Sequence, residues 1–460
     1  MELHEVIEYY HGLLDEAGAR ATFEQLEALV RERDLLVGKP RDRLICSVLR
    51  PRLLTEAQLA ALTRAAALVG GAIRRVGAAA LEAPALLEPY ALSQPERALL
   101  AIDPGYPGAS AFGRLDGFLA PDASACWFVE SNLESPAGIG YDEALVEVFD
   151  QLPIMAEFRK RYAAAPLPHR QGLQRLLLDT YAAWGGAGTP TVAIVDFATA
   201  ATWPEFEFLA AKFRAAGIPT VIADPAWLSY DGSRLLATVP GQPAPTPIDL
   251  VYRRVLQHEF LAQYDLGHPL VRAYTERAVC VVNPFRTKPV HTKLIMALLS
   301  DEDGPAAGLI SAGERAALDQ HVPWTRQVRG GLTRYAGERV PLLTFAQRNR
   351  ERLVLKPNDD YGGQGVLLGW ETDQATWDRA LALAQATPSV VQERVPVPQE
   401  DYPTWSAGEG LRITPRYVDS DPCVYGDEAV GCLTRIAATA LLNVSAGGGA
   451  APPTYLVKDL

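Results

Sequence analysis

The sequence predicts a mixed α/β (α+β) protein, and three features support this fold class. A strand-helix-strand pattern lies in the middle of the chain, helical periodicity covers residues 1–87, and a strand-turn-strand pattern lies on each side of the middle unit. With 460 residues the chain is too long for a single hydrophobic core, so we expect about two or three domains. Its composition, 48% hydrophobic and 21% charged, is typical of a globular protein.

The overall charge and the cysteines bound the class of the protein. A net charge of -12 and a pI of about 5.2 argue against nucleic acid or an anionic membrane as the main partner. The five cysteines are scattered and form no C-x-x-C pair, which indicates neither a disulfide framework nor a zinc site. The start MELHEVIEYYHGLL is acidic where a signal peptide needs base, and no uncharged apolar run is long enough to cross a bilayer. We therefore expect a cytoplasmic protein.

The elements can be expected in chain order. Residues 1–87 are alanine-rich with apolar residues at helical spacing, and we interpret them as structural packing helices. Two short strands are expected at 113–120 and 125–132, with the turn-forming sequence PDAS between them. A further helical stretch at 145–183 leads to WGGAGTP, which has the composition of a linker.

The middle of the chain alternates between strand and helix. Strands are expected at 191–197 and 218–225, with a helix at 203–217 that has a proline near its start and a glycine at its end. This order places the two strands parallel in one sheet. Two further strand-like segments, 248–256 and 278–285, extend the unit.

Four polar side chains converge if the first two short strands pair as a hairpin, called the carboxylate hairpin below. Residues two apart share a face of a strand, so Arg114 lies with Asp116, and Glu130 with Asn132. A turn of odd length places Asp116 opposite Glu130. Facing carboxylates require a cation, and Asp, Glu and Asn oxygens suit Mg²⁺, so we predict Asp116, Glu130 and Asn132 as metal ligands. A solvent-facing hairpin with an ordinary ion pair is the alternative.

A second hairpin, the glycine hairpin, is expected at residues 353–370, LVLKPNDDYGGQGVLLGW. Its loop does not open into a helix as in P-loop and Rossmann proteins, because an apolar strand-like run follows Gly365. Glycines in such a loop can turn backbone N–H groups toward an anion, so we predict that Gly362, Gly363 and Gly365 cover phosphates. Lys356 ends the first strand and can reach the same anion. An ordinary surface hairpin is the alternative.

Further residues complete the parts of an ATP site. Lys293 lies on a short amphipathic helix expected at 291–301 and supplies a second cation for phosphates. The strand VVQERV carries Gln392 and Glu393, whose backbone groups could hold an adenine. Arg435 in CLTRIA could add positive charge at the γ-phosphate.

In this order the motifs resemble those of the circularly permuted branch of the ATP-grasp family, which includes glutathionylspermidine synthetase. The family's R-x-D and E-x-N motifs match the carboxylate hairpin, and its phosphate lysines and glycine lid match Lys293 and LKPNDDYGGQGV. The tail LTRIAATALLNVSAGGG is similar to that of permuted ATP-grasp proteins, which places Arg435 and Asn443 at the site. The resemblance spans roughly residue 110 to the C-terminus. Two features depart from it: no Cys–His amidase domain precedes these motifs, and Glu134 stands where we expect an Asp in related chains.

The resemblance implies a circularly permuted ATP-grasp with an inserted glutathione-synthetase-like α/β substrate domain. The implied parts are a helical N-terminal region at 1–110, the metal-binding part of the ATP-grasp at 111–185, the substrate domain at 186–285, and the ATP-binding lid with the remaining ATP-grasp at 286–460.

The activity that the resemblance implies is ATP- and Mg²⁺-dependent ligation of a small-molecule carboxylate to an amine, with peptides and polyamines as candidates. The carboxylate attacks the γ-phosphate, an acylphosphate forms, and the amine displaces phosphate. Arg114 would stabilise the acylphosphate or the oxyanion. Arg253 or Arg254 either orients the substrate carboxylate or forms a structural ion pair.

Two other functions stay open from the sequence. One is an ATP-dependent phosphotransferase that stops at the phosphorylated product, and a requirement for an amine would separate it from a ligase. The other is a non-catalytic ATP-binding module, which need not keep the full set of ligands and lysines. For an enzyme, we expect Asp116→Asn or Glu130→Gln to remove most ATP turnover while leaving the fold intact.

Overall fold

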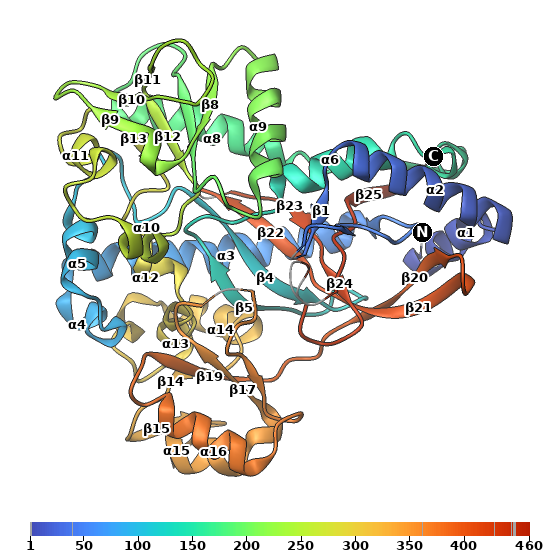
Figure 1. The fold of residues 1–460 in the computed structure, drawn as a ribbon. Helices are drawn as coiled ribbons and strands as arrows, with labels where there is room; N and C mark the ends of the chain where they lie inside the picture. The colour runs from blue at the N-terminus through green and yellow to red at the C-terminus, as the bar shows by residue number, and fades with distance from the viewer. Residues whose placement is uncertain (1, 39, 361, 427, 443, 445–447) are drawn as a thin grey trace.

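The structure is a computed structural model that describes residues 2–38, 40–360, 362–426, 428–442, 444 and 448–460. It has the mixed α/β architecture expected from the sequence, with helices and strands alternating along much of the chain. Figure 1 shows an α/β unit at the upper left, a lid at the bottom, and helices α1 (Leu3–Gly12) and α2 (Glu16–Glu32) at the right. None of the described helices combines the length and the apolar character needed to span a membrane.

The α/β unit is built on a parallel sheet, as the sequence predicts. Its strand order is β13-β12-β7-β8, and every pairing in it is parallel. The strands are short buried runs rich in Val and Ile, and they pack against two helices that share their hydrophobic cluster. The elements are β7 (Val192–Val195), β8 (Thr220–Ala223), β12 (Leu250–Arg253), β13 (Cys280–Val282), α8 (His169–Trp184) and α9 (Trp203–Ala215).

Two antiparallel sheets carry most of the residues predicted to bind ATP and metal. The central sheet has the order β23-β22-β4-β5, and the lid sheet has the order β14-β19-β17-β18. In Figure 1 the lid sheet lies below the central sheet, with α15 (Leu342–Arg348) and α16 (Gln374–Leu383) on its outer face. The central strands are β4 (Phe112–Leu119), β5 (Cys126–Asn132), β22 (Asp421–Tyr425) and β23 (Glu428–Leu433). The lid strands are β14 (Thr325–Gln327), β17 (Leu353–Pro357), β18 (Leu367–Leu368) and β19 (Ser389–Glu393).

The N-terminal region contains long helices but also three short strands that the sequence did not predict. Strand β3 (Arg52–Leu54) pairs in parallel with β25 (Thr454–Asp459), which pairs on its other side with β6 (Tyr162–Pro166). Strand β6 also interrupts the helical stretch expected at 145–183. These pairings join segments from opposite ends of the chain, so local propensity cannot reveal them. The other elements here are α1 (Leu3–Gly12), α2 (Glu16–Glu32), β1 (Leu36–Val37), β2 (Arg43–Leu44), α3 (Glu56–Glu82), α6 (Ile139–Phe149) and α7 (Pro153–Phe158).

Helix α13 (Leu294–Ser300) corrects another expectation. Residues 294–299 are all buried, although the sequence indicated an amphipathic helix. It packs against α3, α14 (Ala312–His321), β14 and β5, so apolar surfaces surround it. Its N-terminal end follows α12 (Lys288–His291), and this junction holds Lys293 in place beside β5.

The remaining elements complete the α/β unit, the lid and the C-terminal part. They are α4 (Pro84–Leu87), η1 (Glu88–Tyr90), α5 (Gln94–Ala101), η2 (Pro225–Trp227), β9 (Leu228–Tyr230), β10 (Leu235–Ala237), β11 (Thr246–Ile248), α10 (Gln257–Gln263), α11 (Pro269–Thr275), η3 (Ala307–Leu309), β15 (Leu332–Tyr335), β16 (Glu338–Pro341), α15 (Leu342–Arg348), η4 (Arg350–Arg352), α16 (Gln374–Leu383), β20 (Gln399–Ser406), β21 (Gly410–Val418) and β24 (Ile436–Ala437).

Candidate functional site

The carboxylate hairpin has the predicted pairing, but it reaches that pairing by a different route. Strands β4 and β5 place Asp116 opposite Glu130. The loop 120–125 has an even length, because Leu119 pairs with Cys126, so the expected odd turn is wrong. A bulge at Val129 then shifts the register by one residue before the carboxylates meet.

The bulge also leaves the Val129 carbonyl free to contact the lid sheet. A bulged residue leaves the regular ladder, and the carbonyl oxygen of Val129 accepts a hydrogen bond of 3.2 Å from Lys356 Nζ. Lys356 Nζ also donates to Gln392 Oε1 at 2.6 Å. Thus β5 of the central sheet faces β17 and β19 of the lid sheet.

Asp116 lies at the centre of a buried charge network. Its carboxylate accepts two hydrogen bonds from Arg114, at 2.7 and 3.1 Å, and one of 2.8 Å from Asn132 Nδ2. Arg435 Nη2 donates to it at 2.7 Å. Burial alone would raise the pKa of Asp116, but Arg114 and Arg435 hold that pKa well below its usual range. The structure therefore brings Arg435 to the carboxylate hairpin, and its role at the γ-phosphate stays a prediction.

Two further aspartates belong to this network and were missed from the sequence. Asp419 accepts from Arg435 Nε at 2.6 Å, and Asp421 lies 3.0 Å from Arg435 Nη2 and 3.7 Å from Arg114 Nε. Burial raises the pKa of Asp419 and raises that of Asp421 well above its usual value. They follow β21 in the sequence YVDSDP, which has no spacing that distinguishes it from a turn. Asn443, also expected at the site, lies outside the described residues.

The two predicted phosphate lysines meet at β5 from separate elements. Lys293 Nζ lies 3.0 Å from Glu130 Oε1, and Lys356 reaches the neighbouring Val129 carbonyl. Burial lowers the pKa of Lys356 to about 8, with Lys293 adding to the effect and Glu130 opposing it. Lys356 therefore occupies a place where its charge is poorly compensated until an anion binds.

The glycine hairpin is confirmed, with Val354 and Leu355 of β17 paired to the short strand β18. Asn358 fixes the start of its loop, because its carbonyl accepts from the N–H of Lys293 at 3.1 Å and its side chain accepts from the next N–H at 2.8 Å. The loop glycines Gly362, Gly363 and Gly365 have φ values of +66°, +74° and +67°, which side chains with a Cβ rarely adopt. The loop is thus held beside Lys293 and shaped by its glycines.

Gln392 and Glu393 lie on opposite faces of β19. Gln392 joins Lys356 to Thr325 on the face toward β5, whereas Glu393 accepts a 2.6 Å hydrogen bond from Tyr335 on the outer face. The N–H of Glu393 already donates to the carbonyl of Trp324 at 2.7 Å. A pocket of about 450 Å³ opens where β19 ends, lined by residues 393–396 and by two tryptophans, Trp127 and Trp324. An adenine contact at this end of β19 stays a prediction.

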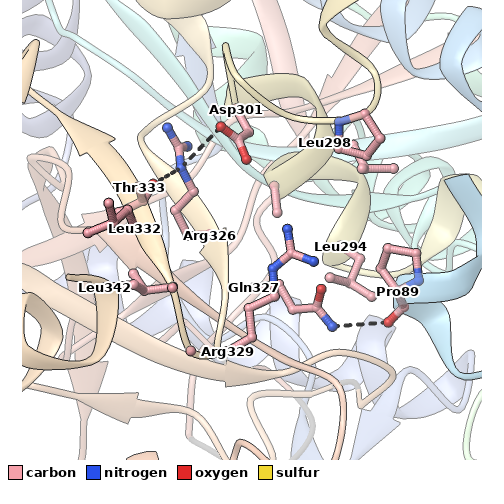
Figure 2. A pocket seen from close by; sticks show the side chains of 14 residues that line it. Pro89, Leu294, Leu298, Asp301, Arg326, Gln327, Arg329, Leu332, Thr333 and Leu342 are labelled. Carbon is pink, nitrogen blue, oxygen red and sulfur yellow. Dashed lines mark hydrogen bonds and ion pairs between the residues drawn. The ribbon is translucent and has the colours of Figure 1, made fainter. Parts of the chain in front are cut away.

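A second pocket, shown in Figure 2, is too small for a nucleotide. It has about 60 Å³, room for only a few water molecules, and lies between α13 and the loop that follows β14. Figure 2 shows Arg326 directed toward Asp301, and Gln327 donating to the carbonyl of Pro89. Arg326 and Asp301 thus pair with each other within the protein.

Arg253 and Arg254 form structural ion pairs at the junction with the α/β unit. Arg253 Nη1 lies 2.7 Å from Glu134 Oε1, and Arg254 lies 3.4 Å from Glu205. All four side chains are at most 3% exposed. Arg253 also donates to the carbonyl oxygens of residues 255, 283 and 284, so it has no donor directed toward the central sheet.

The three predicted metal ligands, Asp116, Glu130 and Asn132, fit a metal ion only if a nucleotide supplies further oxygen ligands. Within the described part of the chain, no group of three or more His, Cys, Asp or Glu side chains could hold a metal. Both oxygens of Asp116 carry hydrogen bonds from arginines, whereas Glu130 is 25% exposed and pairs with one lysine. Asn132 uses its amide N–H, which leaves its oxygen available. Mg²⁺ commonly takes one or two carboxylates and completes its shell with phosphate oxygens and water.

Comparison with solved structures identifies the fold. A glutathione synthetase-like effector (GSS30) from Globodera pallida matches 95% of this chain and 97% of its own, with a TM-score of 0.58 and 12% identity. The chain has a glutathione-synthetase-like fold. A putative gamma-glutamylcysteine synthetase from Methylobacillus flagellatus KT covers 85% of both chains at 10% identity, but its TM-score of 0.40 is too low to support an argument.

Among curated proteins, the chain is similar to a putative glutamate–cysteine ligase 2-2 from Frankia casuarinae (strain DSM 45818 / CECT 9043 / HFP020203 / CcI3). The two are 27% identical over 350 residues, which cover 70% of this chain. The match spans 36% of the relative, so this chain corresponds to about a third of that protein. No family model matches the sequence.

Proposed function

We propose that the protein is an ATP-dependent carboxylate–amine ligase of the ATP-grasp type. One observation carries the proposal: Lys293 and Lys356 come from separate elements and meet at β5 beside Glu130, with the glycine loop held next to them. Two cations and a glycine loop around one carboxylate form a cradle for a triphosphate. The glutathione-synthetase-like fold and the ligase relative support the same class of reaction.

In this proposal Lys293 and Lys356 bind the phosphates of ATP, and the loop glycines cover them. Asp116, Glu130 and Asn132 would hold Mg²⁺ together with phosphate oxygens. Bound Mg²⁺ would neutralise charge on the phosphates. Lys293 then exchanges its contact with Glu130 for a phosphate oxygen.

The reaction begins when a substrate carboxylate oxygen attacks the γ-phosphorus, and the bond from that phosphorus to the β-phosphate oxygen breaks to release ADP. The amine nitrogen next bonds to the acyl carbon while the carbon–oxygen bond to phosphate breaks, and the departing phosphate takes the proton that the amine loses. Arg114 and Arg435 stand at the carboxylate hairpin and would stabilise the negative charge of these intermediates. Lys293 and Lys356 offset the negative charge of the ATP phosphates, so that the substrate carboxylate can approach them.

The order of motifs supports a circularly permuted arrangement, because the carboxylate hairpin precedes both phosphate lysines in the chain. We also propose that the chain is divided into four parts, with boundaries at residues 110, 185 and 285. Substrates of the amino acid or peptide class agree with the names of the relatives, and polyamines, which glutathionylspermidine synthetase-like specificity would favour, are further candidates. A cytoplasmic location also belongs to the proposal.

The test is turnover of ATP against pooled carboxylates and amines, with and without Mg²⁺. We expect release of ADP and phosphate that depends on Mg²⁺, an acid and an amine, and a condensed product in the mass spectrum. ADP release with an acid alone, giving a stable phosphorylated product, would replace the ligase by a phosphotransferase. No ATP binding would overturn the proposal.

Lys356 makes ATP binding depend on proton uptake. Its pKa of about 8 lies below the ordinary 10.5, so between these values the ligand-free protein holds it mostly uncharged. Phosphate beside the amine favours the charged form, so at pH 9 we expect ATP binding to take up a fraction of a proton that falls toward zero below pH 7. Calorimetry in buffers with different ionisation heats measures this uptake.

Lys356→Arg provides the control, because guanidinium stays protonated throughout this pH range. The variant should bind ATP with no proton uptake from residue 356. Equal uptake by both proteins would show that another group is responsible.

A further inference from the structure

Three polar side chains beside the proposed ATP site have unused hydrogen-bonding atoms. Glu134 Oε2, His291 Nδ1 and Asp359 Oδ1 are buried and have no hydrogen-bond partner among the described residues. His291 Nε2 lies 3.4 Å from Glu134 Oε2 and 3.8 Å from Asp359 Oδ1, so the three groups form one cluster. Buried polar atoms without partners are rare in proteins, and a ligand is one way to satisfy them.

The cluster lies next to the phosphate lysines because β5 and α12 run side by side. Along this contact, Glu130 lies beside Lys293, the Ser131 hydroxyl donates to the Val290 carbonyl, and Glu134 lies beside His291. The cluster thus lies beside the C-terminal end of β5, where the phosphates of ATP are proposed to bind. Substrate groups that react with ATP must lie close to this end.

The glycine-loop side of the cluster is the side nearest to solvent. The side chain of Glu134 is fully buried and that of His291 is 12% exposed, but the side chain of Asp359, on the glycine loop, is 33% exposed. A ligand would therefore approach the buried Oδ1 of Asp359 from the loop side.

The free carboxylate oxygens of Glu134 and Asp359 favour a ligand that donates hydrogen bonds. Arg253 and the N–H of Gln257 occupy only Glu134 Oε1, and Lys288 pairs with Asp359 Oδ2. Each carboxylate therefore keeps one oxygen that can only accept a hydrogen bond. An ammonium group supplies the donors for both oxygens, whereas an anion would be repelled by them.

His291 is suited to receive a proton. Burial lowers its pKa, and Lys288 and Lys293 lower it further, while Glu134 and Asp359 raise it. Glu134 is held by an ion pair of 2.7 Å with Arg253, and both side chains are fully buried. A neutral imidazole thus stands between two carboxylates, one of them fixed by a buried ion pair.

We propose that Glu134 and Asp359 bind the ammonium group of the acceptor amine and that His291 takes up its proton. This inference rests on the proposed ligase function. An N–H bond of the ammonium breaks, its proton moves to an imidazole nitrogen, and the electron pair remains on the amine nitrogen. That pair then forms the bond to the acyl carbon, while the phosphate leaves with its own electron pair.

Hydroxylamine tests this step because it is largely uncharged at neutral pH and needs no deprotonation before it attacks an acylphosphate. With the acid substrate and MgATP, we expect His291→Asn to lower amide formation by about 100-fold and to leave hydroxamate formation within about threefold of wild type. His4→Asn, a substitution of an exposed histidine on α1, is the matched control and should change neither rate.

Asp359→Asn gives a second variant on the more exposed side of the cluster. We expect it to raise KM for the amine by about tenfold or more and to leave KM for ATP unchanged. Asp179→Asn, on the exposed face of α8, is its control.

The outcomes separate this inference from the proposed function. Equal losses of amide and hydroxamate in His291→Asn, or no loss in either, would overturn the role of His291. An unchanged amine KM in Asp359→Asn would overturn the ammonium site. If the wild-type protein forms neither hydroxamate nor ADP with any acid, the ligase function itself fails and the inference with it.

Discussion

Glu130→Gln is expected to lower MgATP-dependent turnover by about 100-fold or more, because it removes the carboxylate that pairs with Lys293 and is partly open to a ligand. The folded protein should tolerate the change. Glu130 is 25% exposed but Lys293 is only 6% exposed, so loss of the pair should cost about 1 to 3 kcal/mol. Steady-state release of ADP measures the turnover, and a thermal melt of the same protein measures the change in stability.

Glu157→Gln is a matched control, since Glu157 forms an exposed pair with Lys160 at a similar 2.7 Å. It should alter neither turnover nor melting temperature. Wild-type turnover in Glu130→Gln would contradict the role of Glu130 as a metal ligand.

Asp116→Asn is expected to abolish turnover and also to destabilise the fold. Asparagine keeps the size of the side chain but leaves Arg114 and Arg435, which are 12% and 27% exposed, with one anion fewer. Loss of one partner of a buried ion pair commonly costs about 3 kcal/mol or more. This adds a stability loss that the sequence alone did not indicate. Urea unfolding should show a lower midpoint with an unchanged slope.

Asp122→Asn serves as the control for this stability effect, because Asp122 lies in the exposed turn of the same hairpin and accepts hydrogen bonds from Ser124. Its unfolding midpoint should stay close to wild type. An Asp116→Asn protein as stable as Asp122→Asn would show that the two arginines are balanced by Asp419 and Asp421 alone.

The sequence predicted the parts of the site whose signal is local. Alternation along two short strands placed Asp116 opposite Glu130, and the glycine pattern predicted the hairpin that carries Lys356. The strand-helix-strand order predicted the parallel sheet. The expected odd turn is wrong: the loop has an even length, and a one-residue bulge at Val129 restores the pairing of Asp116 with Glu130.

The parts that the sequence did not predict depend on contacts between distant segments. Asp421 joins the arginines through the pairing of β22 with β4, about 300 residues apart in the chain. The cluster of Glu134, His291 and Asp359 brings together a loop, a short helix and the glycine hairpin, and none of the three has a distinctive local pattern. Burial of α13 likewise follows from its neighbours and not from its own periodicity.

Transfer of oxygen from the acid to phosphate tests the central claim most directly. An acid labelled with ¹⁸O in its carboxylate is incubated with MgATP and the amine, or with hydroxylamine in its place, and the released phosphate is examined by mass spectrometry. The proposed reaction predicts ADP and a phosphate that carries one labelled oxygen for each product formed, because the carboxylate oxygen bonds to the γ-phosphorus. Unlabelled phosphate beside a condensed product, or label in AMP, would contradict it.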